Sequence, residues 1–420
     1  MPERKTPQVR FKGFTDTWEQ RKVGELLIER NEQAPMNEEY PLMAFIANEG
    51  VAPKGERYDR SSLVTDTENK LYKRTEFGDF IYSSNNLETG SIGLNKYGKA
   101  CISPVYSVFH PTGIADSNFL GRRLVRKDFI NSMVKWRQGV IYGQWRIHES
   151  DFLKIDIPVP SVEEQRQIGT FLDYLDHLIT LHQREGERLQ MVKKSMLENC
   201  FPKNGEKVPR FRFAGFTGDW EQRKLGDCFS LLQNNTLSRA ELSNGNGVAM
   251  NVHYGDVLIK FDECLDVSKE QLPFIEKHSV ADKLKTSYLQ NGDVIVADTA
   301  EDETVGKCTE IMGVTDQKVI SGLHTIPLRP NGKFATGYFG FYLNSAAYHD
   351  QLKPLMQGIK VTSISKSAMQ DTVIRYPSDI KEQEMIGRYF INLDHLITLH
   401  QSELEMLKKI KESMLGKMLV

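Results

Sequence analysis

The chain has 420 residues, with 54 Lys and Arg against 56 Asp and Glu and a formal net charge of -2. This length predicts two or three domains, and the balanced charge excludes a global basic excess as the basis of nucleic-acid binding. Five scattered cysteines without a CxxC pair argue against a disulfide framework, and the absence of about 18 consecutive apolar residues predicts a soluble, cytoplasmic protein.

The chain opens on a segment that it later repeats. Residues 10–22 read RFKGFTDTWEQRK, and residues 212–224 read RFAGFTGDWEQRK. The aromatic residues of the first copy, Phe11, Phe14 and Trp18, lie on a short glycine-containing stretch, which predicts an anchor packed on a neighbouring element. The chain is therefore two tandem copies of one plan: an anchor, a globular domain and a helix.

A variable stretch of domain size follows each anchor, at residues 23–157 and 225–374. Runs typical of strands, separated by turn residues, predominate in both stretches. We predict strands at 78–82, 101–103, 255–259 and 292–296, and helices at 128–137 and 337–353. Each stretch is expected to form an α+β domain with a curved, largely antiparallel sheet.

Each copy closes on a long helix. The nine residues LDHLITLHQ occur at 175–183 and again at 393–401. Each copy follows a proline, Pro160 or Pro377, and then runs for about 38 residues without another, which predicts helices of about 57 Å. The predicted boundaries are 1–160 for the first anchor and domain, 161–201 for the first helix, 202–378 for the linker, second anchor and second domain, and 379–420 for the second helix.

Apolar residues recur along both helices at heptad spacing, which predicts an antiparallel intramolecular coiled coil with pseudo-two-fold symmetry. The first anchor should then pack near the end of the second helix. The alternative is that each apolar stripe packs on its own domain. His182 and His400 are either partly exposed at a defect of the coil or form a buried polar layer that fixes its register. The predicted seam comprises Ile168, Phe171, Leu175, Leu178, His182, Leu189, Val192, Ile386, Tyr389, Leu393, Leu396, His400, Leu407 and Ile410.

Two loops in equivalent places of the copies, 139–146 (GVIYGQWR) and 358–366 (GIKVTSISK), have side chains suited to a nucleic acid. Arg and Gln pair with guanine and adenine edges, whereas Lys, Ser and Thr suit phosphates. Taken singly, each such residue is more often an ordinary surface residue. Candidate DNA contacts are Tyr72, Lys73, Arg74, Asn85, Asn86, Tyr142, Gln144, Trp145, Arg146, Lys360, Thr362, Ser363 and Lys366, with Arg122 and Arg123 as further candidates.

No motif predicts a catalytic residue or a metal site. Residues 93–99 spell GxxxxGK, but Ala100 replaces the Ser or Thr of a phosphate-binding loop. His177 and His182 are five positions apart, which is not the HExxH spacing of a zinc site. We therefore expect a chain that catalyses nothing by itself.

The chain resembles the specificity (S) subunits of type I restriction–modification enzymes. The resemblance rests on Ile157-Pro158-Val159-Pro160 with Glu164-Gln165, and on the weaker Ile374-Arg375-Tyr376-Pro377 with Glu382-Gln383, each before a long helix. It implies two target-recognition domains, held apart by the antiparallel helices, that each read one half of an asymmetric bipartite DNA target.

The resemblance also implies partners. Two methyltransferase (M) subunits dock on the chain and bring S-adenosylmethionine, and restriction (R) subunits bring ATP and Mg; no cofactor and no membrane contact belong to the chain itself. The alternative is a non-catalytic coiled-coil scaffold whose two domains bind proteins or glycans. DNA affinity that falls steeply with salt would distinguish the two. A self-contained methyltransferase or nuclease is disfavoured by the missing motifs.

Overall fold

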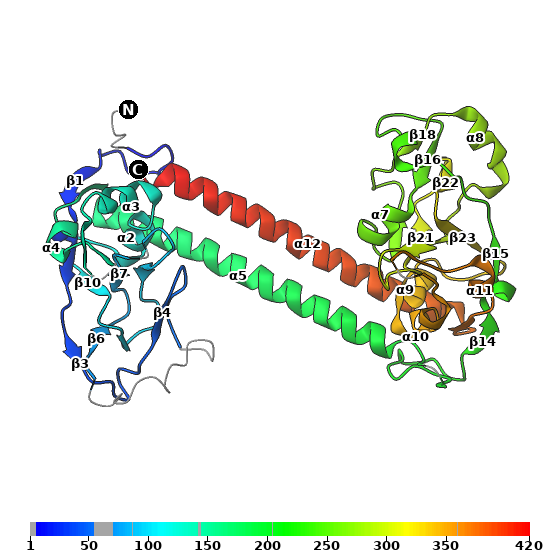
Figure 1. Cartoon of the computed structure of the whole chain (residues 1–420), viewed down its shortest axis with the longest axis horizontal. Coiled ribbons are helices and arrows are strands. Elements are labelled where there is room, and N and C mark those ends of the chain that lie inside the picture. The colour runs from blue at the N-terminus through cyan, green and yellow to red at the C-terminus, as the bar shows by residue number, and fades with distance from the viewer. Residues whose placement is uncertain (1–5, 54–69, 86, 142–143, 204, 359) are drawn as a thin grey trace. The chain divides into compact units, whose positions relative to one another are not determined.

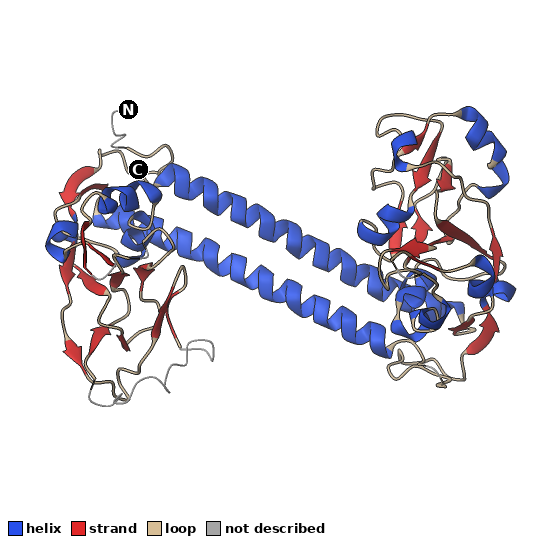
Figure 2. Cartoon of the chain, in the orientation of Figure 1, coloured by secondary structure: helices blue, strands red, loops and turns tan. Residues whose placement is uncertain are grey.

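The computed structural model describes residues 6–53, 70–85, 87–141, 144–203, 205–358 and 360–420, and of residues 139–141, 144 and 145 the backbone only. The chain divides into two compact units, unit 1 (Met1–His182 with Glu403–Val420) and unit 2 (Gln183–Ser402). Strands and helices mix within each unit, which confirms the α+β class (Figures 1 and 2). Within these described ranges, no helix combines the length and the apolarity needed to cross a bilayer.

Unit 1 is built on a four-stranded antiparallel sheet in the order β2-β10-β7-β8 and a three-stranded sheet in the order β3-β6-β9. The strands are β2 (Leu27–Glu29), β3 (Gln33–Ala34), β6 (Tyr72–Thr75), β7 (Phe80–Tyr82), β8 (Ile92–Leu94), β9 (Ala100–Ile102) and β10 (Ser107–Pro111), with the pairs β4 (Ala44–Ile46)–β5 (Gly50–Ala52) and β11 (Gln138–Ile141)–β12 (Gln144–Arg146). The short helices are α1 (Val23–Leu26), α2 (Ser117–Arg123), α3 (Lys127–Val134) and α4 (Glu149–Phe152). The predicted strands at 78–82 and 101–103 and the helix at 128–137 are confirmed.

Unit 2 contains a five-stranded sheet, β15-β23-β19-β21-β17, a three-stranded sheet, β18-β16-β22, and the pair β20-β24. The strands are β15 (Phe229–Leu231), β16 (Ala249–Val252), β17 (Cys264–Asp266), β18 (Phe274–Ile275), β19 (Val294–Ala297), β20 (Thr299–Ala300), β21 (Cys308–Met312), β22 (Val319–Ser321), β23 (Thr325–Pro330) and β24 (Thr362–Ser363). The helices are α6 (Leu225–Cys228), α7 (Tyr254–Ile259), α8 (His278–Lys283), α9 (Tyr338–Asn344), α10 (Ala346–His349), α11 (Lys366–Gln370) and the 3₁₀ turns η3 (Arg239–Glu241), η4 (Lys285–Ser287) and η5 (Lys353–Leu355). Among these strands, β16 pairs with β22 and β17 with β21 in parallel, and the other pairs are antiparallel.

The two units share a sheet order although their middle sequences differ. The order β2-β10-β7-β8 of unit 1 recurs as β15-β23-β19-β21 in unit 2, which adds β17 at the edge. A glycine with positive φ, Gly78 (88°) or Gly292 (91°), precedes β7 and β19, where only glycine adopts the turn without strain. The next residue, Asp79 or Asp293, accepts a backbone N–H three residues earlier at 2.7 or 2.8 Å. The same turn therefore starts the same strand in both copies.

One strand prediction is wrong, because residues 255–259 lie in the helix α7. The imidazole of His253 caps this helix, accepting the N–H of Gly255 at 3.1 Å. Asp256 in the first turn complements the helix dipole. These two local interactions outweigh the strand propensity of Val257 and Ile259.

The repeated anchors form strands that join each domain to its long helix. β1 (Glu19–Lys22) pairs antiparallel with β13 (Asp156–Val159), and β14 (Glu221–Lys224) pairs antiparallel with β25 (Val373–Tyr376). The repeated EQRK of the sequence is the paired strand in both units. Each anchor is therefore fixed to the strand that leads directly into a long helix.

A buried ion pair connects each anchor to the first turn of its helix. Arg10 donates to both carboxylate oxygens of Glu164, at 2.8 and 2.6 Å. Arg212 does the same to Glu382, at 2.7 and 2.8 Å. Both carboxylate side chains are only 1% exposed. We call these two pairs the anchor pairs.

The glutamine after each of these glutamates bonds to the domain. The Oε1 atom of Gln165 accepts the N–H of Asp116 at 2.9 Å, and that of Gln383 accepts the N–H of Ala335 at 3.0 Å. Each Nε2 group donates to the carbonyl of the proline before the helix, at 3.0 and 2.8 Å. The two Glu-Gln motifs are thus structural joints between anchor, domain and helix.

The long helices are α5 (Val162–Asn199) and α12 (Ile380–Met418), of 38 and 39 residues. In unit 1 they run antiparallel, because His182 lies 3.2 Å from Glu403 while Asp176, earlier on α5, lies 2.5 Å from Lys411, later on α12. In unit 2 the repeat-equivalent of the second pair joins Lys193 to Asp394 at 2.6 Å. The predicted antiparallel pairing is confirmed within each unit.

Much of the predicted seam is inside these packed regions. Ile168 and Leu175 are buried in the core of unit 1, against which Leu407 packs. Ile386 and Leu393 are buried in unit 2, with Leu189, Val192 and Tyr389 packed against that core. Phe171, Leu178, His182 and His400 are partly buried, so neither histidine is wholly buried or wholly exposed.

The seam is wrong at Leu396 and Ile410, which are 41% and 36% exposed. The buried face of the first half of α12 instead follows Ile386, Phe390, Leu393 and Ile397. Phe390 turns this face inward, because its ring stacks on Phe341 at 5.0 Å within unit 2. Packing on the domain therefore shifts the stripe that the heptad pattern predicts.

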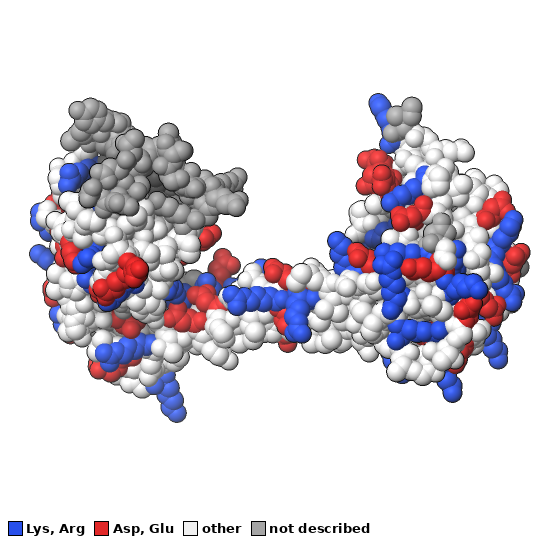
Figure 3. All heavy atoms as spheres, turned by 90° about the horizontal axis from the view of Figure 1, so that it is seen from below, with Lys and Arg blue, Asp and Glu red and all other residues white. Residues whose placement is uncertain are grey.

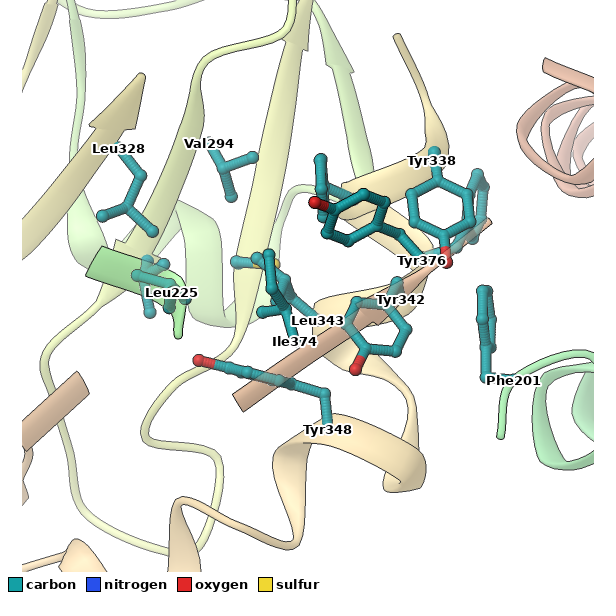
Figure 4. Packing of buried hydrophobic residues seen from close by; sticks show 14 of the residues in the cluster. Phe201, Leu225, Val294, Leu328, Tyr338, Tyr342, Leu343, Tyr348, Ile374 and Tyr376 are labelled. Atoms are coloured by element: carbon teal, nitrogen blue, oxygen red, sulfur yellow. The ribbon is translucent and has the colours of Figure 1, made fainter. Parts of the chain in front are cut away.

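The helix ends are inserted into the cores. Phe201, just after α5, contacts the rings of Tyr338 and Tyr342 at 5.9 and 5.4 Å (Figure 4). In unit 1, Leu419 at the end of the second helix is buried at the repeat-equivalent place. The backbone N–H of Gln8 donates to the carbonyl of Lys417 at 2.9 Å, which confirms that the first anchor packs on this helix end.

Candidate nucleic-acid interface

A polar hollow of about 590 Å³ lies in unit 1 where segments from both of its sheets and the β12–α4 connection meet. It brings together three predicted DNA contacts, Lys73, Asn85 and Arg146, from distant parts of the sequence. The full lining is Glu29, Asn31, Gln33, Lys73, Ser84, Asn85, Pro104, Val105, Tyr106, Ser107, Arg146, Ile147 and Glu149. We call this feature the unit 1 hollow.

Strand pairing places these residues. Lys73 is opposite Gln33 in the β3–β6 ladder. Arg146 ends β12, and the next residue, Ile147, donates its N–H to the hydroxyl of Ser84 at 3.1 Å. This bond holds the end of β12 beside the segment that carries Asn85. Non-local hydrogen bonds thus create the hollow.

Lys73 and Asn85 contribute polar groups to the lining of the hollow. Lys73 is only 6% exposed, and its positive charge acts on Glu149, another residue of the hollow. The Oδ1 atom of Asn85 is buried and has no hydrogen-bond partner within the described ranges. Buried polar atoms are normally satisfied, because burying one without a partner costs about 1–3 kcal/mol. The amide oxygen of Asn85 therefore gains from contact with a hydrogen-bond donor of a ligand.

Two predicted contacts beside Lys73, Tyr72 and Arg74, have partners within unit 1, and their contact with DNA stays a prediction. Tyr72 is buried in a small cluster with Tyr40 and Cys101. Arg74 stacks over the ring of Tyr40 at 4.4 Å and pairs with Glu32 at 2.5 Å. Successive strand residues point to opposite faces, so Tyr72 and Arg74 face away from the side on which Lys73 lines the hollow.

Arg122 and Arg123 have structural partners instead of free guanidinium groups. Arg122 bonds to Asp173 and Asp176 of α5, at 2.6 and 2.7 Å. Arg123 is buried and lies 3.0 Å from Asp128. Both arginines hold the α2–α3 region in place, and their contact with DNA stays a prediction.

Other predicted residues are only partly visible. Asn86 and Tyr142 lie outside the described residues. Gln144 and Trp145 belong to β12, of which the backbone is described and their side chains are not. Their roles stay predictions.

The second predicted loop lies on consecutive elements of unit 2. Thr362 and Ser363 form β24, in which Ser363 is opposite Thr299 of β20. Lys360 and Lys366 are exposed, and the Nζ atom of Lys366 lies 3.4 Å from the Oδ1 atom of Asn234. The loop thus presents two exposed lysines and the exposed Ser363 on unit 2, and its contact with DNA stays a prediction.

Sequence reasoning missed a group next to this loop. His324 adopts a positive φ of 54°, which is unusual for a residue other than glycine. Its Nδ1 atom lies 3.4 Å from the hydroxyl of Thr299, and its ring meets that of Tyr254 edge-on at 5.3 Å. No motif marks these residues, since strand pairing alone brings Thr299 to the predicted loop.

The surface charge is mixed. On the face of unit 2 that Figure 3 shows at the right, Lys and Arg side chains lie among Asp and Glu side chains. That face therefore offers no continuous basic field for non-specific attraction. Recognition on it has to come from particular side chains.

Comparisons with known proteins point to one family. The model of the family described as "Type I restriction modification DNA specificity domain" matches residues 15–191 and again residues 217–409. The MjaVIII specificity subunit of a type I restriction enzyme, from Methanocaldococcus jannaschii, is 22% identical over 423 residues, 96% of this chain and 92% of that protein. The putative MjaX specificity subunit of the same organism is 22% identical over 290 residues, 66% of this chain and 61% of that protein.

A solved structure shares the fold. The S subunit of a type I restriction–modification system from M. genitalium is similar with a TM-score of 0.52 and 14% identity, over 99% of both chains. The similarity extends over both domains and both long helices. The tandem plan of anchor, domain and helix is therefore not peculiar to this chain.

Proposed function

Because the chain belongs to the family of type I restriction–modification DNA specificity domains and carries two of them, we propose that it is the specificity subunit of such a system. Each domain reads one half of an asymmetric bipartite DNA target. The observation that carries this proposal is a repeated architecture with two different polar surfaces. Both units have the same anchor, sheet order and long helix, but unit 1 has the hollow described above and unit 2 has the loop around Ser363 and Lys366.

The paired helices dock the partner subunits and set the spacing of the half-sites. Leu181 and Leu399, equivalent residues of the repeated LDHLITLHQ, are 52% and 43% exposed. Large apolar side chains exposed on a helix favour a protein partner. An equivalent leucine on each helix supports two copies of one partner, as two methyltransferase subunits require.

The partner subunits carry out the methylation and cleavage of DNA. Methyltransferase subunits supply S-adenosylmethionine, restriction subunits supply ATP and Mg, and the complex works on cytoplasmic DNA. The polar groups described above serve other roles: the anchor pairs and the tie between Lys193 and Asp394 hold segments together, and the unit 1 hollow offers hydrogen bonds to a ligand.

Incubating the pure chain with DNA and labelled S-adenosylmethionine should give no methyl transfer. Adding a methyltransferase subunit should give methylation at a single bipartite sequence, because site choice then comes from this chain. The affinity of the pure chain for DNA should fall steeply between about 50 and 200 mM salt. Methyl transfer by the chain alone would contradict the proposal, and so would affinity that does not depend on salt.

A further inference from the structure

The ionisable groups of the unit 1 hollow balance in charge. Glu29 and Glu149 stand against Lys73 and Arg146, so the formal charges cancel. Phosphate is bound by clusters of positive charge and backbone N–H groups, whereas base edges in the major groove present both donors and acceptors. A neutral hollow with strong donors and strong acceptors therefore matches base edges better than phosphate.

Glu149 is held in this hollow as an acceptor. The hydroxyl of Ser107 donates to its Oε1 atom at 2.7 Å. Burial by itself would raise the pKa of the Glu149 carboxyl, but the Ser107 hydroxyl and the charges of Lys73 and Arg146 bring that pKa below its ordinary value. The group is therefore ionised at neutral pH, and Ser107 occupies one of the about four acceptor positions of a carboxylate.

Arg146 and Glu149 are three residues apart, on β12 and at the start of α4, and line the same hollow. We propose that Glu149 is a specificity-determining residue that reads a G·C base pair together with Arg146. Arg146 donates to guanine O6 and N7, and Glu149 accepts the N4–H of the paired cytosine. This assignment rests on the proposed function and adds the identity of one base pair in the half-site of unit 1.

The pattern of hydrogen-bond donors and acceptors in the major groove favours a G·C pair over an A·T pair. A guanidinium needs two adjacent acceptors for its fork, and only guanine presents them. Cytosine presents a donor beside them, which a carboxylate accepts. An A·T pair places the adenine N6–H₂ donor between its acceptors, so it opposes the guanidinium fork of Arg146.

The test uses the chain in complex with its methyltransferase subunit and a DNA library randomised over the target. Glu149→Gln keeps the size of the side chain and an oxygen for Ser107 but adds an N–H₂ donor. Discrimination against other base pairs should fall about tenfold to a hundredfold at one G·C position of one half-site. The control Glu163→Gln removes the same charge from an exposed position of α5 and should leave every preference unchanged.

A modified duplex gives a second readout. N4-methylcytosine at the identified position places a methyl group where the carboxylate binds. It should weaken the wild-type complex and have a much smaller effect on Glu149→Gln. An unchanged preference of Glu149→Gln at every position would overturn the inference, and so would a change at an A·T position. The proposed function fails separately, if the wild-type complex itself selects no bipartite sequence.

Discussion

Replacing Arg10 by Met should destabilise the attachment of the first anchor by about 3–5 kcal/mol, because it leaves a buried carboxylate without its partner. Both oxygens of Glu164 receive their hydrogen bonds from Arg10, and the side chain of Glu164 is 1% exposed. Hydrogen exchange measured by mass spectrometry reports this directly. The amides of β1 and β13 should exchange at least about a hundredfold faster, since about 1.4 kcal/mol corresponds to a factor of ten.

The second copy of the anchor provides a matched control variant. Arg212→Met should accelerate exchange in β14 and β25 and leave β1 unchanged, because its anchor pair belongs to unit 2. Arg21→Met, which removes an exposed ion pair with Glu19, should change neither ladder. The double change Arg10→Met with Glu164→Met should recover most of the loss, since an apolar pair replaces a buried ion pair at little cost. Equal acceleration in both ladders for Arg10→Met would contradict this account.

Inserting one heptad into each long helix, after Glu185 and after Glu403, should lengthen the preferred spacer between the half-sites. Seven residues keep the apolar stripe in phase and add about 10 Å of helix. In B-DNA this corresponds to about three base pairs, which also turn one half-site by about 100° relative to the other. The longer coil supplies the length but little of this rotation, so binding should also weaken. Selection from a library of randomised spacers measures both effects.

An insertion in α5 alone is the matched control. It shifts Lys193 away from Asp394 and should destabilise the helix pair without defining a new spacer. If the doubly lengthened chain kept the original spacer at unchanged affinity, the helices would not set the spacing.

The repeated frame could be predicted from the sequence because its signals are local. The duplicated EQRK, the Glu-Gln motifs and the proline-free heptad stretches each predict one element, and each recurs at a constant interval. The errors have tertiary causes. Residues 255–259 form a helix because His253 caps it, and Leu396 is exposed because Phe390 packs on the domain. Neither of these contacts can be predicted from the spacing of apolar residues along the sequence.

The candidate site could be predicted only in part. Residue type alone predicts Lys73, Asn85 and Arg146 as contacts, but strand pairing between distant segments brings them together. The run Tyr72-Lys73-Arg74 looks like one basic patch in the sequence, yet strand alternation leaves only its middle residue in the hollow. Glu149 belongs to no recognisable sequence motif. An acidic residue by itself does not indicate DNA contact until its neighbours in the folded structure are known.

One chain is expected to hold two domains that read DNA independently. Sequencing of methylated sites in DNA treated with the assembled methyltransferase complex tests it most directly, with wild type and Arg146→Ala compared. Removing a guanidinium that pairs with a base edge should weaken recognition by about 1–3 kcal/mol. We expect a bipartite wild-type motif and a variant motif that is degenerate in one half only, with the other half and the spacer unchanged. Loss of specificity in both halves alike, or a wild-type motif without two separated halves, would contradict it.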